Sequence, residues 1–408
     1  MIIYPLSNIN FQLINEIKKI GCDERSIPIF ANKTNIIPIK ITDIKPSLAN
    51  IIKQEMISCK GDAVIHSKSI SCEIEKTDIL LLGTLSIYYD FISKIEKQNY
   101  KTLNDITYEL KKIIINLNTP TLKITTRNNK ELNFNKPILM GILNITDDSF
   151  YDGGKYKNFD VALKRCEEMI KEGANIIDIG GESTRPGSDP IPLELEMNRV
   201  LPIVEKVYKE FNIIISVDTY KSKVAEEALK LGADIINDIS GMTFDEKMIN
   251  VVKNMNSIVI IMHIKGKPKD MQLNPHYDDV IKELIEYFDE RINFAINNGI
   301  KRDNIIIDPG IGFGKKLEHN LEIMRNLPAF KKYGLPLLLG ASRKSMIGMI
   351  LGDTDKFDEK CLPPSERLYG TLGVNSYGYY NGVNIFRVHD VKFHKEMLKV
   401  LNKILYNN

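Results

Sequence analysis

Three polar side chains, two carboxylates and one amide, end short apolar runs of this chain: Asp218, Asn237 and Asp308. The runs before them are rich in Ile and show no polar alternation, which is typical of strands buried on both faces. If these strands end side by side, the cluster is costly to bury unless a partner supplies N–H donors. An amino-pyrimidinone ring, with several N–H groups along one edge, is a partner of this kind. The alternative is an internal network with Lys344 or Arg343.

Basic side chains gather in other segments that follow apolar runs. They are Arg185, Arg343, Lys344, Arg387 and His389. Phosphate and carboxylate oxygens are the natural partners of guanidinium groups and of a helix N-terminus, and one helix is expected to begin near Ser345. The pattern predicts that the anionic part of the ligand is a diphosphate together with a carboxylate. Alternatively, Arg387 simply pairs with Asp390.

The six histidines form no cluster with the spacing of metal ligands, so a tightly held zinc is not expected. A loosely held Mg²⁺ shared with a diphosphate is expected instead. Mg²⁺ prefers oxygen ligands and substrate phosphates, and Asn144 offers a carbonyl oxygen at the end of another apolar run. His263 is expected either to shape the rim of the site or to contact the ligand.

Eight apolar runs, separated by longer amphipathic segments, must position these side chains. They are Ile138–Leu143, Ile176–Ile179, Ile213–Val217, Ile235–Ile239, Ile258–Met262, Ile305–Ile307, Leu337–Leu339 and Ile385–Val388. Between the first two, a helix is expected over Phe159–Glu172. Alternating strands and helices require a parallel sheet, and eight strands favour a closed (β/α)₈ TIM barrel, whose catalytic residues lie at the C-terminal strand ends. The alternative, an open doubly wound sheet, usually has fewer strands and a Gly-rich first turn, which is missing after Leu143.

Two further parts precede the barrel strands. Leu122–Thr126 and Glu131–Phe134 flank a pair of asparagines and predict a β-hairpin that covers the barrel floor. Residues 1–118 predict a smaller α/β domain, and residues 119–408 the TIM barrel with its hairpin. Strands of the smaller domain are expected near Ile36–Ile41, Ala63–Ile65 and Asp78–Leu82, and helices near Ser47–Ser58, Leu85–Lys97 and Leu103–Leu117. No motif in this domain indicates its role.

The composition is that of an ordinary globular protein: 43% of the 408 residues are hydrophobic, 26% are charged, and the net charge is +2. Because Lys alternates with Glu and Asp along the chain, neither nucleic acid nor a membrane is expected as a partner. The five cysteines are widely spaced and include no C-x-x-C pair, which argues against disulfides and indicates a reduced, cytoplasmic setting. No secretion signal is expected, and the most apolar stretch, Ile79–Leu85, is too short to span a bilayer.

A set of segments, in this order, carries a resemblance to a known family. They read MGILNITDDSFYDGG, DIGGESTRPGS, SVDT, IINDISG, DPGIGFGK, GASRKSMIG, PPSERLYGT and FRVHD. Each segment alone is a weak signal, but the ordered set closely resembles the dihydropteroate synthases of folate biosynthesis, from about Arg127 to the C-terminus. The resemblance implies a transferase that joins 6-hydroxymethyl-7,8-dihydropterin diphosphate to para-aminobenzoate, giving 7,8-dihydropteroate and diphosphate.

The resemblance also implies roles for individual residues. The pterin would bind Asp218, Asn237, Asp308 and Lys344, of which Asp218, Asp308 and Lys344 would be catalytic. The diphosphate and Mg²⁺ would bind Asn144, Arg387 and His389, with Asn144 as the metal ligand. Thr184 would lie near the diphosphate, and Val388 would contact a substrate. Para-aminobenzoate would lie among Arg185, Pro186, Phe313 and Ser345. A homodimer is expected, and two loops, Thr146–Gly154 and Ser183–Asp189, are expected to close over the site.

The sequence departs from the family pattern at two places. Asp147 and Tyr151 replace the usual Pro and Ser of the first loop, which bears on loop closure and metal affinity, and Tyr377, Tyr379 and Tyr380 lie in a helix that is usually Ala-rich. Two other functions remain open. A barrel that passes a methyl group from a folate to a corrinoid protein would share the Asp218, Asn237 and Asp308 triad, and Asp147 and Tyr151 leave open a pterin-binding module without catalysis. The S-T-R-P-G, S-R-K-S and R-V-H-D motifs favour the synthase, because a methyltransferase needs neither a diphosphate nor a carboxylate site.

Overall fold

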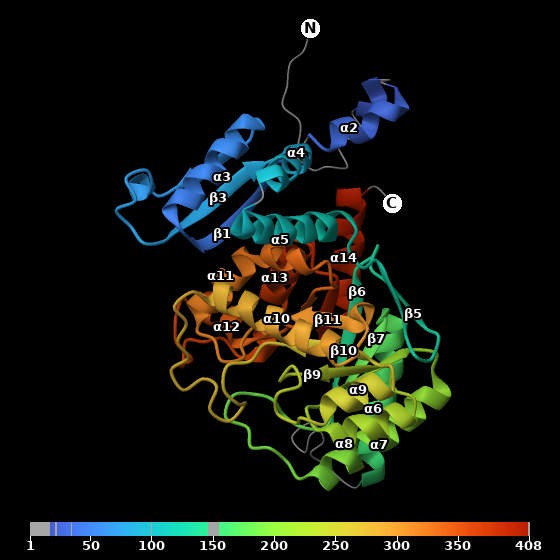
Figure 1. Ribbon diagram of the computed structural model, residues 1–408. Coiled ribbons are helices and arrows are strands. Elements are labelled where there is room, and N and C mark those ends of the chain that lie inside the picture. The colour runs from blue at the N-terminus through green and yellow to red at the C-terminus, as the bar shows by residue number, and fades with distance from the viewer. Residues whose placement is uncertain (1–16, 21–22, 34, 99, 146–154, 407–408) are drawn as a thin grey trace. The chain divides into compact units, whose positions relative to one another are not determined.

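The computed structural model describes residues 17–406 apart from 21–22, 34, 99 and 146–154 (Figure 1). The chain divides into two compact units, Met1–Asn118 with Asn402–Asn408, and Thr119–Leu401. None of the helices that the structure describes combines the length and the apolar character needed for a membrane span.

Eight parallel strands form the centre of the second unit (Figure 1). They are β6 (Ile138–Asn144), β7 (Ile176–Gly180), β8 (Ile214–Asp218), β9 (Ile235–Asp238), β10 (Ile258–Met262), β11 (Ile305–Asp308), β12 (Leu338–Leu339) and β13 (Ile385–Val388). Their order is β11-β10-β9-β8-β7-β6-β13-β12, and a parallel bridge between Ile307 and Leu337 joins the two edges. The expected (β/α)₈ barrel is confirmed, each strand to within one residue at either end, and the open doubly wound sheet is excluded.

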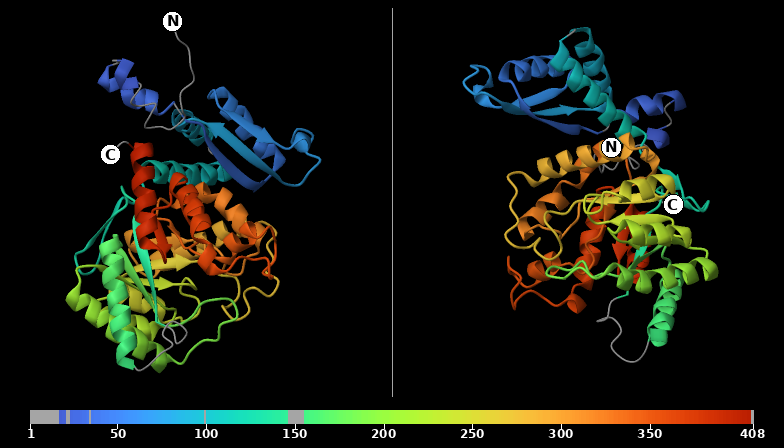
Figure 2. Two further views of the ribbon diagram at one scale, coloured as in Figure 1. Left: turned by 180° about the vertical axis from the view of Figure 1, so that it is seen from behind. Right: turned by 60° about the horizontal axis from the view of Figure 1, so that its bottom comes forward.

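Helices follow the strands and surround them, as both views of Figure 2 show. They are α6 (Lys155–Glu172), α7 (Leu193–Glu210), α8 (Ser222–Lys230), α9 (Met248–Asn254), α10 (Val280–Asn297), α11 (Leu317–Arg325), α12 (Ser345–Leu351), α13 (Leu368–Tyr380) and α14 (Val391–Tyr406), with 3₁₀ turns η5 (Arg302–Asn304), η6 (Leu327–Tyr333) and η7 (Pro364–Glu366). Helix α6 begins at Lys155, four residues before the expected start at Phe159. The earlier start was not expected because Lys155–Asn158 include no aliphatic residue whose spacing would indicate a helix.

The barrel interior is apolar at its floor and polar at its mouth. An Ile-rich cluster that includes Ile176, Ile214 and Ile306 packs with Ile124 and Leu132 of the hairpin β4 (Lys123–Thr125) and β5 (Glu131–Asn133), so the hairpin covers the floor as expected. Side chains alternate between the two faces of a strand, so the residues two positions further along also point inward. On β7, β8, β9, β11 and β13 the inward-facing residues near the mouth are therefore polar: Asp178, Ser216, Asp218, Asn237, Asp308 and Arg387.

The first unit has a core of its own. Its antiparallel sheet has the order β1-β3-β2 and consists of β1 (Ile37–Ile44), β2 (Asp62–Ile65) and β3 (Thr77–Gly83). Alternate residues of β3 are buried, and α3 (Pro46–Ser58), α4 (Leu85–Ile95) and α5 (Lys101–Asn118) share that core. The buried Tyr88 of α4 donates its hydroxyl to the carbonyl of Ile37 at 2.6 Å, which fixes the helix on the sheet. The expected elements are confirmed, and α2 (Ile27–Ala31), η1 (Glu24–Ser26), η2 (Ser67–Ser69) and η3 (Glu96–Gln98) add to them.

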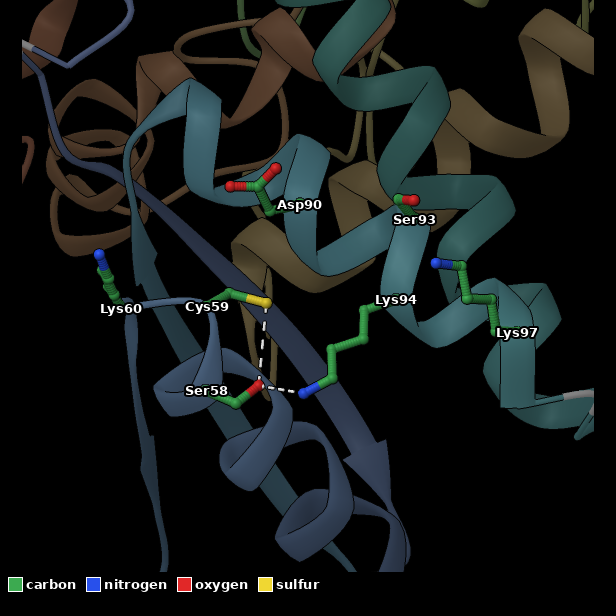
Figure 3. A pocket seen from close by; sticks show the side chains of 7 residues that line it. All are labelled: Ser58, Cys59, Lys60, Asp90, Ser93, Lys94 and Lys97. Atoms are coloured by element: carbon green, nitrogen blue, oxygen red, sulfur yellow. Dashed lines mark hydrogen bonds between the residues drawn. The ribbon is translucent and has the colours of Figure 1, made fainter.

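An open pocket lies on this unit near the C-terminal end of α3 and beside α4 (Figure 3). It has a volume of about 340 Å³ and is lined by Ser58, Cys59, Lys60, Asp90, Ser93, Lys94 and Lys97. Lys94 Nζ contacts Ser58 Oγ and Glu55 Oε2, each at 2.6 Å, so its charge is already balanced within the unit. None of the residues that the sequence analysis singled out lies in this pocket.

Candidate active site

The interior ends of β7, β8, β9 and β13 meet around one guanidinium group. Arg387 donates from Nε to Asp178 Oδ2 and from Nη2 to Asp218 Oδ2, each at 2.6 Å. Asn237 lies beside Asp218 in the register of β8 and β9, and its Nδ2 donates to Asp178 Oδ2 at 3.1 Å. The structure therefore brings Asp218 and Asn237 together, as expected. It assembles them around Asp178, which the sequence analysis did not single out.

Lys344 adds a positive charge to the same interior. Its Nζ lies 3.9 Å from the centroid of the Phe313 ring. Burial lowers the pKa of Lys344 to about 8, the charge of Arg387 adds to this effect, and Asp308 and Asp218 oppose it. Lys344 is thus within electrostatic reach of both carboxylates, as the sequence analysis expected, although it forms no hydrogen bond with either among the described residues.

Several polar atoms of this cluster have no hydrogen-bond partner among the described residues and are not fully enclosed. They are Asp218 Oδ1, Asn237 Oδ1, Asp308 Oδ2 and Lys344 Nζ. Burial raises the pKa of Asp308 to about 6. Burial also raises the pKa of Asp218, and the charge of Arg387 partly offsets this rise. The cluster offers three acceptors and one donor, which suits a ligand with several N–H groups and one oxygen.

The loop after β11 is held by a buried lysine. Lys315 Nζ donates to the carbonyls of Gly310 at 2.9 Å and Phe313 at 3.0 Å, and it lies 2.9 Å from Nδ1 of His263. The N–H of Gly310, in the left-handed region with φ 68°, donates to Asp308 Oδ1 at 2.8 Å. His263 therefore shapes the rim, one of its two expected roles. Lys315 could not be singled out from the sequence, since its partners are mainly backbone carbonyls.

Arg343 is turned away from the interior carboxylates. Its backbone is left-handed, with φ 57°, and its guanidinium donates to both oxygens of Asp390, at 2.6 and 2.9 Å. The alternative pairing of Arg387 with Asp390 is therefore wrong, and so is a network of Arg343 with the interior carboxylates. Helix α12 begins at Ser345, as expected.

His389 is a neutral side chain, contrary to its expected place among the cations. Burial, followed by the charges of Arg387 and Arg343, lowers its pKa to about 3. Its Nδ1 lies 3.0 Å from Ser342 Oγ, and its backbone N–H donates to the same hydroxyl at 3.2 Å. His389 can therefore form hydrogen bonds with a ligand but no salt bridge at neutral pH. Val388 is fully buried, so only its backbone is able to meet a ligand.

A buried ionic network anchors the loop after β7. Lys221 Nζ contacts Glu182 Oε2 at 2.7 Å and Glu196 Oε2 at 2.6 Å. Glu182 Oε1 accepts the hydroxyl of Tyr220 at 2.6 Å. Because Glu182 directly precedes the loop, the network connects the stem of the loop to the end of β8. These residues were not expected to interact, because they lie far apart along the chain.

The loop Ser183–Asp189 carries three of the expected site residues. Thr184 is half-buried, whereas Arg185 and Pro186 are exposed. Burial and the charge of Arg387 lower the pKa of Lys344 most, and the charge of Arg185 also lowers it. Arg185 therefore lies close enough to Lys344 to influence the interior cluster. Asp147, Tyr151 and the rest of the first loop, Thr146–Gly154, lie outside the described residues.

Asn144 ends β6 beside Gly180 of β7. A side-chain carbon added to Gly180 would lie 3.5 Å from Asn144 Oδ1 and 3.8 Å from Asp218 Oδ2, so the glycine leaves a gap flanked by two oxygens. Among the described residues, no group of three or more His, Cys, Asp and Glu side chains is arranged to hold a metal ion.

Comparisons with known proteins agree with one another. The family described as pterin binding enzyme matches residues 140–389. The dihydropteroate synthase of Bacillus subtilis is 44% identical over 270 residues, which are 66% of this chain and 89% of the relative. The dihydropteroate synthase of Yersinia pestis, solved with a sulfonamide drug complex, gives a TM-score of 0.64 at 38% identity and covers 69% of this chain and 98% of its own. That of Xanthomonas albilineans, solved with 4-aminobenzoic acid, gives 0.64 at 34% identity with the same coverage.

Fold and site together define a (β/α)₈ barrel enzyme whose mouth is lined by acceptors for a heterocycle. The chain belongs to the pterin binding enzyme family, and within it to the dihydropteroate synthases, which are transferases of folate biosynthesis. These relatives favour the synthase over the corrinoid-dependent methyltransferase.

Proposed function

We propose that this chain joins 6-hydroxymethyl-7,8-dihydropterin diphosphate to para-aminobenzoate and releases 7,8-dihydropteroate and diphosphate. The proposal rests on polar atoms of Asp218, Asn237, Asp308 and Lys344 that have no hydrogen-bond partner in the part of the chain that the structure describes. The pyrimidine part of a pterin presents N–H donors along one edge and a carbonyl oxygen beside it, which complements three acceptors and one ammonium. Charge-assisted hydrogen bonds of this kind contribute about 1.5–3 kcal/mol each, which is enough to orient a small heterocycle.

The diphosphate would bind around Arg387, at the end of β13. The half-buried guanidinium lies 2.6 Å from Asp218, one of the interior carboxylates. Thr184 and the neutral His389 would add hydrogen bonds to the diphosphate, and the backbone of Val388 would contact it. A guanidinium next to a leaving diphosphate stabilises the charge that develops on the departing oxygen.

The residues present fit a Mg²⁺ ion that is shared with the diphosphate. Mg²⁺ takes oxygen ligands and is usually bound by one or two protein oxygens together with substrate phosphates. Asn144 Oδ1 would be the protein ligand, in the gap that Gly180 leaves open. When bound, the ion would neutralise charge on the departing diphosphate.

Para-aminobenzoate would lie between the loop after β7 and the start of α12. Its carboxylate would meet Arg185 and the hydroxyl of Ser345, and its ring would lie between Pro186 and Phe313. Phe313 is buried in a small cluster with Met262 and Met271, so one side of this subsite is apolar.

The chemistry needs charge stabilisation more than a strong base. The methylene C–O bond to the diphosphate breaks and its electron pair leaves with the diphosphate, while the amine nitrogen forms the new C–N bond and then loses a proton. The Asp218 carboxylate would stabilise the cationic methylene, together with the electron-rich dihydropterin. Closure of the loop Ser183–Asp189 would exclude the water that otherwise traps the cation.

Two features of the assembly belong to the same proposal. The exposed aromatic side chains of α13, Tyr369, Tyr377 and Tyr380, support a homodimer formed through this helix. Light scattering should give twice the chain mass, and Tyr380→Glu should shift the protein towards the monomer.

The free thiols of Cys59, Cys72, Cys166 and Cys361 support a reducing, cytoplasmic setting.

Purified protein, incubated with both substrates and Mg²⁺, tests the reaction. We expect diphosphate and dihydropteroate to appear in equal amounts. If pterin binds but neither product forms, the non-catalytic module is the right reading, and if pterin does not bind, the assignment of the interior cluster is wrong.

A further inference from the structure

Asp178 lies at the centre of the interior cluster. It is fully buried on β7, and its Oδ2 accepts from Arg387 Nε at 2.6 Å and from Asn237 Nδ2 at 3.1 Å. Its Oδ1 is buried and has no hydrogen-bond partner among the described residues. A buried carboxylate that is only half satisfied is unfavourable for stability, which suggests that it serves another purpose.

The carboxylate determines which way the amide of Asn237 points. The two ends of an Asn amide are nearly identical in shape but opposite in hydrogen bonding, so packing alone hardly distinguishes them. Paired with Arg387, Asp178 is an anion that only accepts hydrogen bonds. The amide must therefore turn its NH₂ group to Asp178, which leaves Asn237 Oδ1 as the atom available to a ligand.

Arg387 is held by the same carboxylate. Its Nε is bound to Asp178 and its Nη2 to Asp218, so two anions on adjacent strands fix the plane of the guanidinium. Without Asp178 the group keeps one charged partner and is free to rotate about it. Asp178 thus orients both an acceptor for the heterocycle and the cation beside it.

We propose that Asp178 is a positioning residue that makes the heterocycle-facing edge of the site an all-acceptor edge by fixing the direction of Asn237. The inference rests on the proposed function and adds the origin of its selectivity. With Asp218 and Asp308 as the other acceptors, the edge binds N–H groups and repels a carbonyl oxygen. A pterin should therefore bind well, and its 2-oxo analogue, a lumazine, should bind poorly.

Asp178→Asn is the direct test, since it nearly preserves volume while it removes the charge and replaces one acceptor oxygen by a donor NH₂ group. The new amide is able to accept or to donate, so Asn237 becomes free to flip and to present its NH₂ group to the ligand. We expect 6-hydroxymethylpterin to bind at least tenfold more weakly by calorimetry. The preference for 6-hydroxymethylpterin over 6-hydroxymethyllumazine should fall by a similar factor, and the KM for para-aminobenzoate should stay within twofold.

Ser216→Ala is the matched control. Ser216 lies opposite Asp178 in the register of β7 and β8, is equally buried, and carries an Oγ without a partner among the described residues. Its removal deletes a polar atom at the same level of the barrel without touching Asn237 or Arg387. Pterin affinity and selectivity should stay within twofold of wild type.

A double-variant cycle separates positioning from a general loss of charge. In the Asn237→Ala background, Asp178→Asn should weaken pterin binding markedly less than in the wild-type background. Equal losses in the two backgrounds would overturn the inference, because Asp178 would then act without Asn237.

The wild-type protein alone also tests the inference, whether or not the Asp178 variant folds. Equal affinity of wild type for the pterin and the lumazine would overturn the inference and leave the proposed function standing. Failure of the wild type to bind the pterin at all would instead overturn the proposed function.

Discussion

The ammonium of Lys315 lies 2.9 Å from Nδ1 of His263, and both side chains are buried at the rim of the barrel. Burial lowers the pKa of Lys315 to about 7, and burial followed by the charge of Lys315 lowers the pKa of His263 well below its usual value. The neutral imidazole therefore accepts a hydrogen bond from the lysine. Since the same ammonium binds the carbonyls of Gly310 and Phe313, the pair fixes the loop that carries Phe313 into the site.

Lys315 should make stability depend on alkaline pH. Between its folded pKa of about 7 and the ordinary value of about 10.4, the unfolded chain binds the proton more strongly, so stability should rise with pH over this range. Urea unfolding at pH 7 and pH 9.5 should show a smaller rise for Lys315→Met than for wild type. Lys223→Met, which removes an exposed lysine, should keep the wild-type dependence. If the free energy of unfolding rises with pH as much in Lys315→Met as in Lys223→Met, Lys315 keeps its proton in the folded state.

Asp218 and Lys344 should be required for catalysis. Asp218→Ala removes the carboxylate expected to stabilise the cationic methylene. Lys344→Ala removes an ammonium of the interior cluster that forms no hydrogen bond with the described residues. Each should lower kcat/KM at least about tenfold, roughly 1.4 kcal/mol. Initial rates of product formation measure this, with the exposed Lys301→Ala as a control. Unchanged kinetics in both variants would mean that the pterin lies elsewhere.

Lys344 should also set the alkaline limit of activity. Burial lowers its pKa to about 8, so the ammonium that would bind the pterin oxygen is lost as pH rises through that value. The kcat/KM for the pterin diphosphate should fall above about pH 8. Lys344→Arg, whose side chain keeps its charge at this pH, should move the decline to higher pH even if its rate is lower. A profile that is identical in the two proteins would assign the decline to another group.

Much of the barrel could be predicted because its strands are buried on both faces. Such strands are continuous apolar runs, and where a run ends in a polar residue, that residue lies at the mouth, as Asp218 and Asp308 do. The start of α6 could not be predicted, because Lys155–Asn158 include no aliphatic residue that would show helical spacing.

The partners of the site residues were harder to predict than the residues. Asp178 lies two positions after the interior Ile176, so its phase in the strand was a usable signal, but its partner Arg387 is 209 residues away. The charge of His389 was predicted incorrectly, since a sequence shows a histidine but not the burial that keeps it neutral. Lys315 was missed because backbone carbonyls leave no trace in the sequence.

Lys221 should stabilise the barrel and the loop after β7 together. Lys221→Met would leave the carboxylates of Glu182 and Glu196 buried without their cation, which costs about 3–5 kcal/mol in comparable buried pairs. Urea unfolding should show a loss of this size, and the KM for para-aminobenzoate should rise because Arg185 and Pro186 lose their support. The exposed Lys230, which pairs with Glu226 and Glu227 on α8, supplies the control Lys230→Met, with a loss below about 1 kcal/mol. A loss equally small at Lys221 would show that the network is solvated.

The fragment 119–408 should fold without the first 118 residues. The barrel core is complete within it, because the hairpin residues Ile124 and Leu132 cover the floor and the first unit has a separate core around Tyr88 and Phe91. The fragment should unfold cooperatively and bind the pterin with wild-type affinity. A second fragment that begins at residue 137 lacks the hairpin and exposes the Ile-rich floor, so it should be insoluble or much less stable. If the longer fragment is also insoluble, the two units depend on each other for folding, and residues 1–118 are part of the folding unit of the barrel.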